Sequence, residues 1–202
     1  MPRPWLERFH RLYYEERTAL RRRDSEGWIA LQRPYPHLRR LLLRHGVRGR
    51  VAVLTARDRA SLEQLLGAWG LDRVIAPERI YDKETGVRKT AHLARLCGDL
   101  AVPPGRVTFV DDKLNHLRAT APLGVRGLLA GWGHNGPREH AEARRLGFPV
   151  VTEETAARLL FGVEDDGSTP RPERVEAPQR EAGPGGQGAD TEQEERQVPE
   201  EE

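Results

Sequence analysis

Apolar and polar positions along the first 163 residues follow two alternating patterns. Short runs rich in β-branched residues, typical of buried strands, alternate with stretches of about ten residues whose apolar positions recur at helical spacing. The expected strands are 51–54, 73–76, 107–110, 127–130 and 149–151. The expected helices are 37–45, 59–69, 90–100, 114–121, 138–146 and 153–160. Strands that alternate with helices indicate crossover connections, so the pattern predicts an α/β fold with a mainly parallel sheet.

The two ends of the chain depart from this alternation. Residues 4–33 have a helical pattern that includes Trp5 and Phe9, and Pro34 interrupts it. From residue 164 onward Pro, Gly, Glu and Gln dominate, and such a segment buries too little apolar surface to offset its ordering entropy. We therefore expect a helical segment 1–34, an α/β core 35–163 and a disordered acidic tail 164–202.

Charge and cysteine content restrict the class of protein. The tail 164–202 has 13 acidic and four basic residues, a net charge of −9, which leaves +11 on the rest of the chain. Of the 33 basic residues 30 are arginines, and they are scattered over helix faces instead of forming a patch with aromatic residues, which argues against nucleic-acid binding. The single Cys97 cannot form an internal disulfide, and no export signal or membrane span is visible. The chain is predicted to be cytoplasmic, with no membrane partner.

Polar side chains follow two of the expected strands, and a lysine opens a helix between them. Thr55 comes directly after the first strand, and Asp111 and Asp112 end the run VTFVDD. Lys89 begins the helical stretch KTAHLARL. Because the carboxyl ends of parallel strands meet at one edge of a sheet, these side chains should converge. A hydroxyl and an ammonium suit phosphoryl oxygens, and paired carboxylates suit a divalent cation, so the sequence predicts a site for a phosphate and a metal.

In order and spacing, these motifs resemble the haloacid dehalogenase superfamily of phosphohydrolases over residues 35 to about 160. The strand that ends in Thr55 matches the second family motif, Lys89 the third, 34 residues later, and the pair Asp111 and Asp112 the fourth, another 22 residues on. The resemblance implies a Rossmann-like fold and Mg²⁺-dependent hydrolysis of a phosphomonoester through an aspartyl-phosphate. It also implies that residues 1–34 form a small helical cap, which leaves the site open to a phosphorylated small molecule or macromolecule.

The resemblance assigns the roles as follows. Thr55 and the strand-end amide at Ala56 would bind phosphoryl oxygens, and Lys89 would neutralise the charge of the transferring group. Asp111 and Asp112 would bind Mg²⁺, with Asp111 as the nearer ligand. Taken singly, each residue has a simpler interpretation: a threonine can cap the next helix, a lysine is usually solvated and two aspartates often form a turn.

Three further features are left with two interpretations each. Asn115 and His116 are candidates for substrate contact, or polar residues of a helix first turn that face solvent. The loop GWGHNGPREH after the fourth expected strand could contact substrate through Trp132, His134, Asn135 and Arg138, or form a plain turn. Aromatic residues of the N-terminal helix could bind a partner, although we expect Trp5, Phe9 and Tyr13 to pack the cap onto the core.

The first family motif, an apolar strand followed by DxDx[TV], has no counterpart before Pro34. The resemblance implies that this strand lies centrally, between the strands that carry Thr55 and Asp111, so two strand edges should be left unpaired. Three explanations are open. The start of the chain could be placed too late, by about ten to twenty residues, which we favour; the protein could be an inactive relative that binds phosphate or a partner; or the two edges could close against each other.

Overall fold

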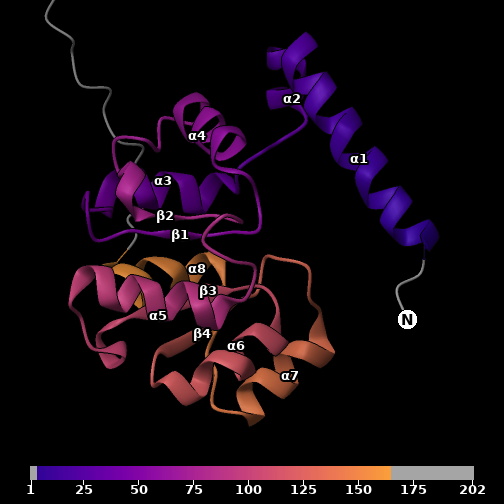
Figure 1. Ribbon diagram of the computed structural model, residues 1–202. Helices are drawn as coiled ribbons and strands as arrows, with labels where there is room; N and C mark the ends of the chain where they lie inside the picture. The colour runs from indigo at the N-terminus through magenta and orange to yellow at the C-terminus, as the bar shows by residue number, and fades with distance from the viewer. Residues whose placement is uncertain (1–3, 165–202) are drawn as a thin grey trace, which may run out of the picture. The chain divides into compact units, whose positions relative to one another are not determined.

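A computed structural model describes residues 4–164, which all belong to one structural unit, Met1–Pro170. The fold is mixed α/β, as predicted, and its elements are shown in Figure 1. The α-helices are α1 (Pro4–Arg23), α2 (Ser25–Ala30), α3 (Pro36–His45), α4 (Arg59–Ala68), α5 (Lys89–Leu100), α6 (Leu114–Thr120), α7 (Pro137–Arg145) and α8 (Glu153–Ala156). Helix α8 continues as a π-helical stretch, η4 (Ala157–Phe161), and short 3₁₀ turns are η1 (Pro77–Arg79), η2 (Pro104–Arg106) and η3 (Ala121–Leu123). Apart from Glu164, the predicted disordered tail lies outside the described residues.

The strands form two small parallel sheets. They are β1 (Val53–Leu54), β2 (Ile80–Tyr81), β3 (Thr108–Asp111), β4 (Arg126–Ala130) and β5 (Val150–Val151). One sheet is β1-β2 and the other is β3-β4-β5. Every strand pair is parallel, with Leu54 opposite Tyr81 and Asp111 opposite Leu129. The predicted parallel arrangement is confirmed.

One predicted strand is wrong. Residues 73–75 form a turn and a bend, and the strand in this region is β2, where the sequence predicts no strand. Val74, Ile75 and Ala76 are nevertheless buried, with exposed fractions of 5%, 4% and 1%. Val74 and Ile75 belong to the apolar cluster that also contains Leu62 of α4. Their apolar character therefore reflects packing under a helix, without strand pairing.

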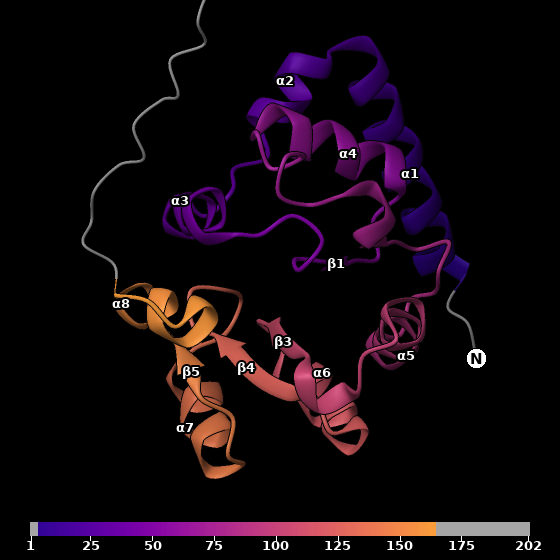
Figure 2. The same ribbon diagram turned by 90° about the vertical axis from the view of Figure 1, so that its left-hand side faces the viewer.

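Strands β1 and β3 each have a single strand partner among residues 4–164, and they do not pair with each other. Their unpaired sides are called here the open edges. The two strands contribute to one apolar cluster, because Leu54 of β1 packs against the cluster that contains Phe109 of β3 and Leu93 of α5 (Figures 1 and 2). Among residues 4–164 these two edges are unpaired and do not close against each other, and the central strand that the resemblance implies stays a prediction.

The strands also differ in how deeply they are buried. The residues of β2 have exposed fractions of 4% and 3%, and Leu128 and Leu129 of β4 are at 0%. Both residues of β1 are only partly buried. An inner strand of a sheet covered by helices is normally buried on both faces. β1 is therefore less covered than β2, although each has one strand partner among the described residues.

The N-terminal helices differ in how they are packed. Trp28 of α2 is buried, with 1% of its surface exposed, whereas α1 contains no buried residue. Trp5, Phe9 and Tyr13 are exposed by 63%, 58% and 54%, so the prediction that they pack the cap onto the core is wrong. Within residues 4–164, no helix combines the length and the apolar character that crossing a bilayer requires.

Candidate functional site

Lys89 lies at the carboxyl end of β1. It is the first residue of α5, and its ammonium donates a hydrogen bond to the backbone carbonyl of Leu54, the last residue of β1. Burial lowers the pKa of Lys89, while the carboxylates of Asp111 and Asp112 raise it and so oppose that shift. The ammonium therefore lies at the end of β1 and within the electrostatic influence of the two acids that end β3. The contact of Lys89 with the end of β1 is direct, whereas its convergence with the acid pair stays a prediction.

Thr55 follows β1 directly and extends its pairing, because its amide donates to the Tyr81 carbonyl at 2.8 Å. It does not cap the following helix: Asp58 is the N-cap residue of α4 and accepts a hydrogen bond from a first-turn amide at 2.9 Å. The Thr55 hydroxyl oxygen instead accepts from the Arg57 amide at 3.1 Å. That bond does not use the hydroxyl proton, which is thus left to donate to a ligand. Ala56 is exposed in the bend between these residues.

Asp111 is held by the helix that follows it. Its Oδ1 accepts a hydrogen bond from the Lys113 amide at 2.9 Å, and its two oxygens lie 3.0 and 3.1 Å from Nδ1 of His116 in α6. Because an ionised carboxylate only accepts hydrogen bonds, Nδ1 of His116 carries a hydrogen in this pair. His116 therefore belongs to the site through Asp111. Asn115, the other candidate in this turn, is exposed.

Asp112 is held by a different segment, the loop between β4 and α7. Its Oδ2 accepts a hydrogen bond from the His134 amide at 2.9 Å. Its backbone oxygen accepts from the side-chain amide of Asn135, also at 2.9 Å. The two adjacent acids thus have separate supports, Asp111 on α6 and Asp112 on this loop. Sequence reasoning left the loop with two interpretations and did not identify its contact with Asp112, which lies 22 residues earlier than His134.

The two acids fit Mg²⁺ by their chemistry. This ion is usually bound through one or two carboxylates and keeps several waters, so Asp111 and Asp112 supply a suitable donor set. Residues 4–164 contain no group of three or more His, Cys, Asp and Glu side chains arranged to hold a metal. A tight cage made by protein ligands alone is therefore not part of the described structure, and the Mg²⁺ site stays a prediction.

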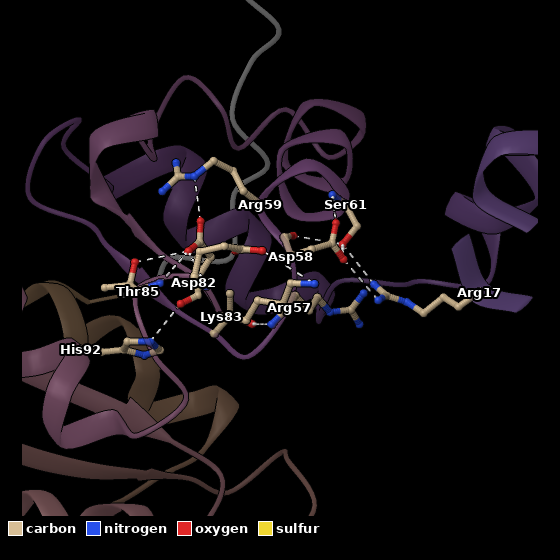
Figure 3. A network of polar contacts seen from close by, with 11 residues as sticks. Arg17, Arg57, Asp58, Arg59, Ser61, Asp82, Lys83, Thr85 and His92 are labelled. Atoms are coloured by element: carbon tan, nitrogen blue, oxygen red, sulfur yellow. Dashed lines mark hydrogen bonds and ion pairs between the residues drawn. The ribbon is translucent and has the colours of Figure 1, made fainter. Parts of the chain in front are cut away.

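A buried carboxylate, Asp82, anchors the loop that leads to α5 (Figure 3). Its exposed fraction is 2%, and its Oδ2 lies 2.7 Å from Nε of Arg59. Its Oδ1 accepts hydrogen bonds from the amides of Glu84 and Thr85 at 3.1 and 3.2 Å. Burial alone raises the pKa of Asp82, but the hydrogen bonds from Thr85 and the charge of Arg59 outweigh it, and the pKa is lowered.

The same loop is fixed to α5 from the other side. Nε2 of the buried His92 lies 3.1 Å from the Asp82 carbonyl oxygen and 2.6 Å from that of Gly86. These contacts set the position at which α5 begins, and with it the position of Lys89. Sequence reasoning placed Asp82 in a loop and gave it no role, because nothing local distinguishes a buried loop carboxylate from a solvated one.

The N-terminal helical segment is attached beside the Thr55 turn (Figure 3). Arg17 of α1 donates to the Ser61 hydroxyl at 3.1 Å and to Asp58 Oδ2 at 3.4 Å. Arg57 donates to the side-chain oxygen of Gln32 at 2.9 Å. Polar contacts, with little apolar burial along α1, therefore connect this segment to the turn after β1.

A polar cavity of about 400 Å³ lies at β2 and the loop after it. It is lined by Arg59, Glu78, Ile80, Tyr81, Asp82, Glu84, Thr85, Arg95 and Asp99. None of Thr55, Lys89, Asp111 and Asp112 lines it. We assign the site to the strand ends, because the residues whose chemistry suits a phosphate and a metal lie there.

Comparison of the chain with protein-family models, with curated proteins and with solved structures finds no match.

Proposed function

We propose that residues 35–163 form a phosphate-handling core like that of the haloacid dehalogenase superfamily, which hydrolyses a phosphomonoester with Mg²⁺ when an attacking carboxylate is supplied. The observation that carries this proposal is the position of Lys89. Its ammonium contacts the last carbonyl of β1 and is influenced by the acids that end β3. A partly buried cation at a strand end, followed by a hydroxyl and influenced by two carboxylates, is suited to hold a phosphoryl group beside a divalent ion.

In this proposal the chain's own residues bind and orient the substrate. The Thr55 hydroxyl and the Ala56 amide donate to phosphoryl oxygens, and Lys89 offsets their negative charge. Asp111 and Asp112 would hold Mg²⁺, which when bound neutralises further charge on the phosphoryl group. Burial of Lys89 strengthens its interaction with an anion, because a lower local dielectric constant increases electrostatic attraction.

The attacking carboxylate has to reach the open edges of β1 and β3. Two other acids near the Thr55 turn already have structural partners: Asp58 caps α4, and Asp82 pairs with Arg59. A strand running parallel to β1 and β3 between their open edges would end beside Lys89, where a carboxylate could attack phosphorus. We therefore expect residues 35–163 alone to bind phosphate with little turnover.

The first experiment measures binding. Inorganic phosphate is titrated into the 202-residue chain, with and without Mg²⁺, and followed by calorimetry. Lys89→Ala should weaken binding about tenfold or more, because a hydrogen bond to a charged group contributes about 1.5–3 kcal/mol. Lys83→Ala is the matched control: its side chain is 47% exposed and lies near Glu84, so its removal should leave binding unchanged. Equal effects of the two substitutions would refute the proposed site.

A second candidate function is a phosphate-binding module without catalysis, and the open edges of β1 and β3 favour it. The two functions are separated by adding a synthetic apolar strand peptide that ends in Asp-x-Asp and following hydrolysis of p-nitrophenyl phosphate. Turnover that is lost in Lys89→Ala supports the enzyme. Saturable phosphate binding without turnover supports the binding module, and no phosphate binding refutes both.

A further inference from the structure

We propose that Asn135 is a positioning residue for Asp112, and that His140 holds Asn135 in the required orientation. The inference rests on the proposed function, because it concerns how one of the two carboxylates at the phosphate and metal site is fixed. It gives a role to the loop Gly131–Gly136, for which the sequence left a plain turn as one interpretation. Its support is a continuous set of contacts from α7 through this loop to the end of β3.

The side-chain amide of Asn135 bridges two neighbouring strands. Its Nδ2 donates to the backbone oxygens of Asp112 and Ala130, each at 2.9 Å. Ala130 is the last residue of β4, and Asp112 directly follows β3. Because both acceptors are carbonyl oxygens, only the nitrogen of the amide can face them. The orientation of Asn135 is thereby fixed, and its Oδ1 is directed to the other side.

His140, in α7, completes the arrangement. Its Nε2 lies 2.6 Å from Oδ1 of Asn135. A carbonyl oxygen accepts and does not donate, so Nε2 of His140 carries the hydrogen and is the donor. The helix thus holds the amide, and the amide holds the backbone at the strand end. With its backbone held by Asn135 and its Oδ2 bonded to the His134 amide, the Asp112 side chain keeps a single orientation, which is what a metal-binding carboxylate requires.

Gly133 brings the loop into direct contact with Asp112. A Cβ at this position would lie 2.2 Å from Cβ of Asp112, so only glycine permits the approach. The amide of the next residue, His134, donates to Oδ2 of Asp112. Gly136, in the same loop, differs: a Cβ there would meet only a side-chain oxygen of Glu139, at 3.6 Å. We therefore expect alanine to be tolerated at Gly136 and to disrupt the loop at Gly133, so the two glycines form a matched pair.

The loop is also anchored on its other side. The ring of Trp132 packs edge-to-face on His37 of α3, with ring centroids 4.7 Å apart. With the loop fixed at Trp132 and at Asn135, Oδ2 of Asp112 is engaged by the His134 amide. Asp111 depends on His116 instead. Loss of Asn135 should therefore loosen Asp112 and leave Asp111 in place.

The test compares Asn135→Ala with Glu142→Ala. The side chain of Glu142, in the same helix as His140, bonds to Arg145 at 2.7 and 2.8 Å, so its removal breaks an exposed pair outside the proposed site and it is the control. The first readout is the side-chain rotamer of Asp112, obtained from three-bond Hα–Hβ couplings in labelled protein. We expect one rotamer in the wild type and in Glu142→Ala, and averaging between rotamers in Asn135→Ala and His140→Ala. His140→Gln, which can still donate to Asn135, should restore one rotamer.

The second readout is binding of Mn²⁺ as a probe for the divalent site. Removal of a partner that orients a ligand typically weakens metal binding about 10–100-fold, so we expect this loss in Asn135→Ala and none in Glu142→Ala. A single Asp112 rotamer in Asn135→Ala overturns the inference, whatever the metal does. Failure of the wild type to bind Mn²⁺ counts against the proposed function, and the rotamer comparison still decides the inference. The inference would also be overturned if Gly133→Ala and Gly136→Ala affected the Asp112 rotamer equally.

Discussion

Replacing Asp82 with alanine removes a buried carboxylate that holds four donors. Two of them are backbone amides, one is the Thr85 hydroxyl at 3.3 Å, and one is the guanidinium of Arg59. The Arg59 side chain is 41% exposed and keeps its bonds to the carbonyls of Pro77 and Ile80, so water and these carbonyls offset most of its loss. The two amides lose a charged acceptor in a partly buried loop. At about 1–2 kcal/mol for each, the free energy of unfolding should fall by about 2–4 kcal/mol.

The assay is urea unfolding followed by circular dichroism, and it has a control that shares the same arginine. Glu63 also pairs with Arg59, at 3.6 Å, but its side chain is 47% exposed. Because exposed pairs of this kind contribute about 0.3–0.5 kcal/mol, Glu63→Ala should change stability by no more than that. A loss below about 1 kcal/mol in Asp82→Ala would show that the loop amides are solvated once the carboxylate is gone, and the argument that Asp82 sets the start of α5 would be wrong.

Three other predictions concern the acid stability of the fold, two of its glycines and one core leucine. Hydrogen bonds and nearby arginines outweigh burial and hold the pKa of Asp58 and of Asp82 below the usual 3.8. The unfolded chain therefore binds more protons than the folded one in acid, and stability should be complete above about pH 5 and decline as pH falls through the folded-state pKa values, as acid titration by circular dichroism can show. Gly67→Ala, in the last turn of α4 with open space at its Cβ, should stabilise by about 0.4–1 kcal/mol. Gly124→Ala, at φ +82°, should destabilise by about 1–2 kcal/mol, and a common sign of the two effects in thermal melts would contradict this. Leu128→Ala, at a fully buried position, should cost about 2–5 kcal/mol in urea unfolding, and a smaller loss would mean that the core collapses around the site.

The elements predicted well from sequence are those whose signals are local. β3 is an apolar run with an abrupt polar end, and α5 has helical periodicity before two prolines, so their bounds come within one residue of prediction. β2 was missed because a two-residue strand is too short to show alternation, while the nearby buried turn 73–76 has the apolar composition of a strand. Composition reports burial more directly than it reports the hydrogen bonding of the backbone.

The candidate site residues and their supports differ in the same way. Thr55, Lys89 and Asp111 could be proposed from sequence because strand ends in a parallel sheet share an edge, a rule that depends only on element order. The supports of the acids could not be found. The contact of Asn135 with Asp112 joins segments 23 residues apart through one side chain, and no periodic or compositional signal accompanies it.

The open edges of β1 and β3 also make this fold sensitive to mass action. A peptide strand that pairs with both edges binds the folded chain and has no equivalent site on the unfolded one, so the thermal midpoint should rise with peptide concentration. At a peptide concentration of one hundred times the dissociation constant, the free energy of unfolding should rise by about 2.7 kcal/mol. A neighbouring copy can also pair with strand edges of this kind. Crowded solutions of the chain should therefore self-associate, and a peptide that occupies the edges should act as a solubiliser.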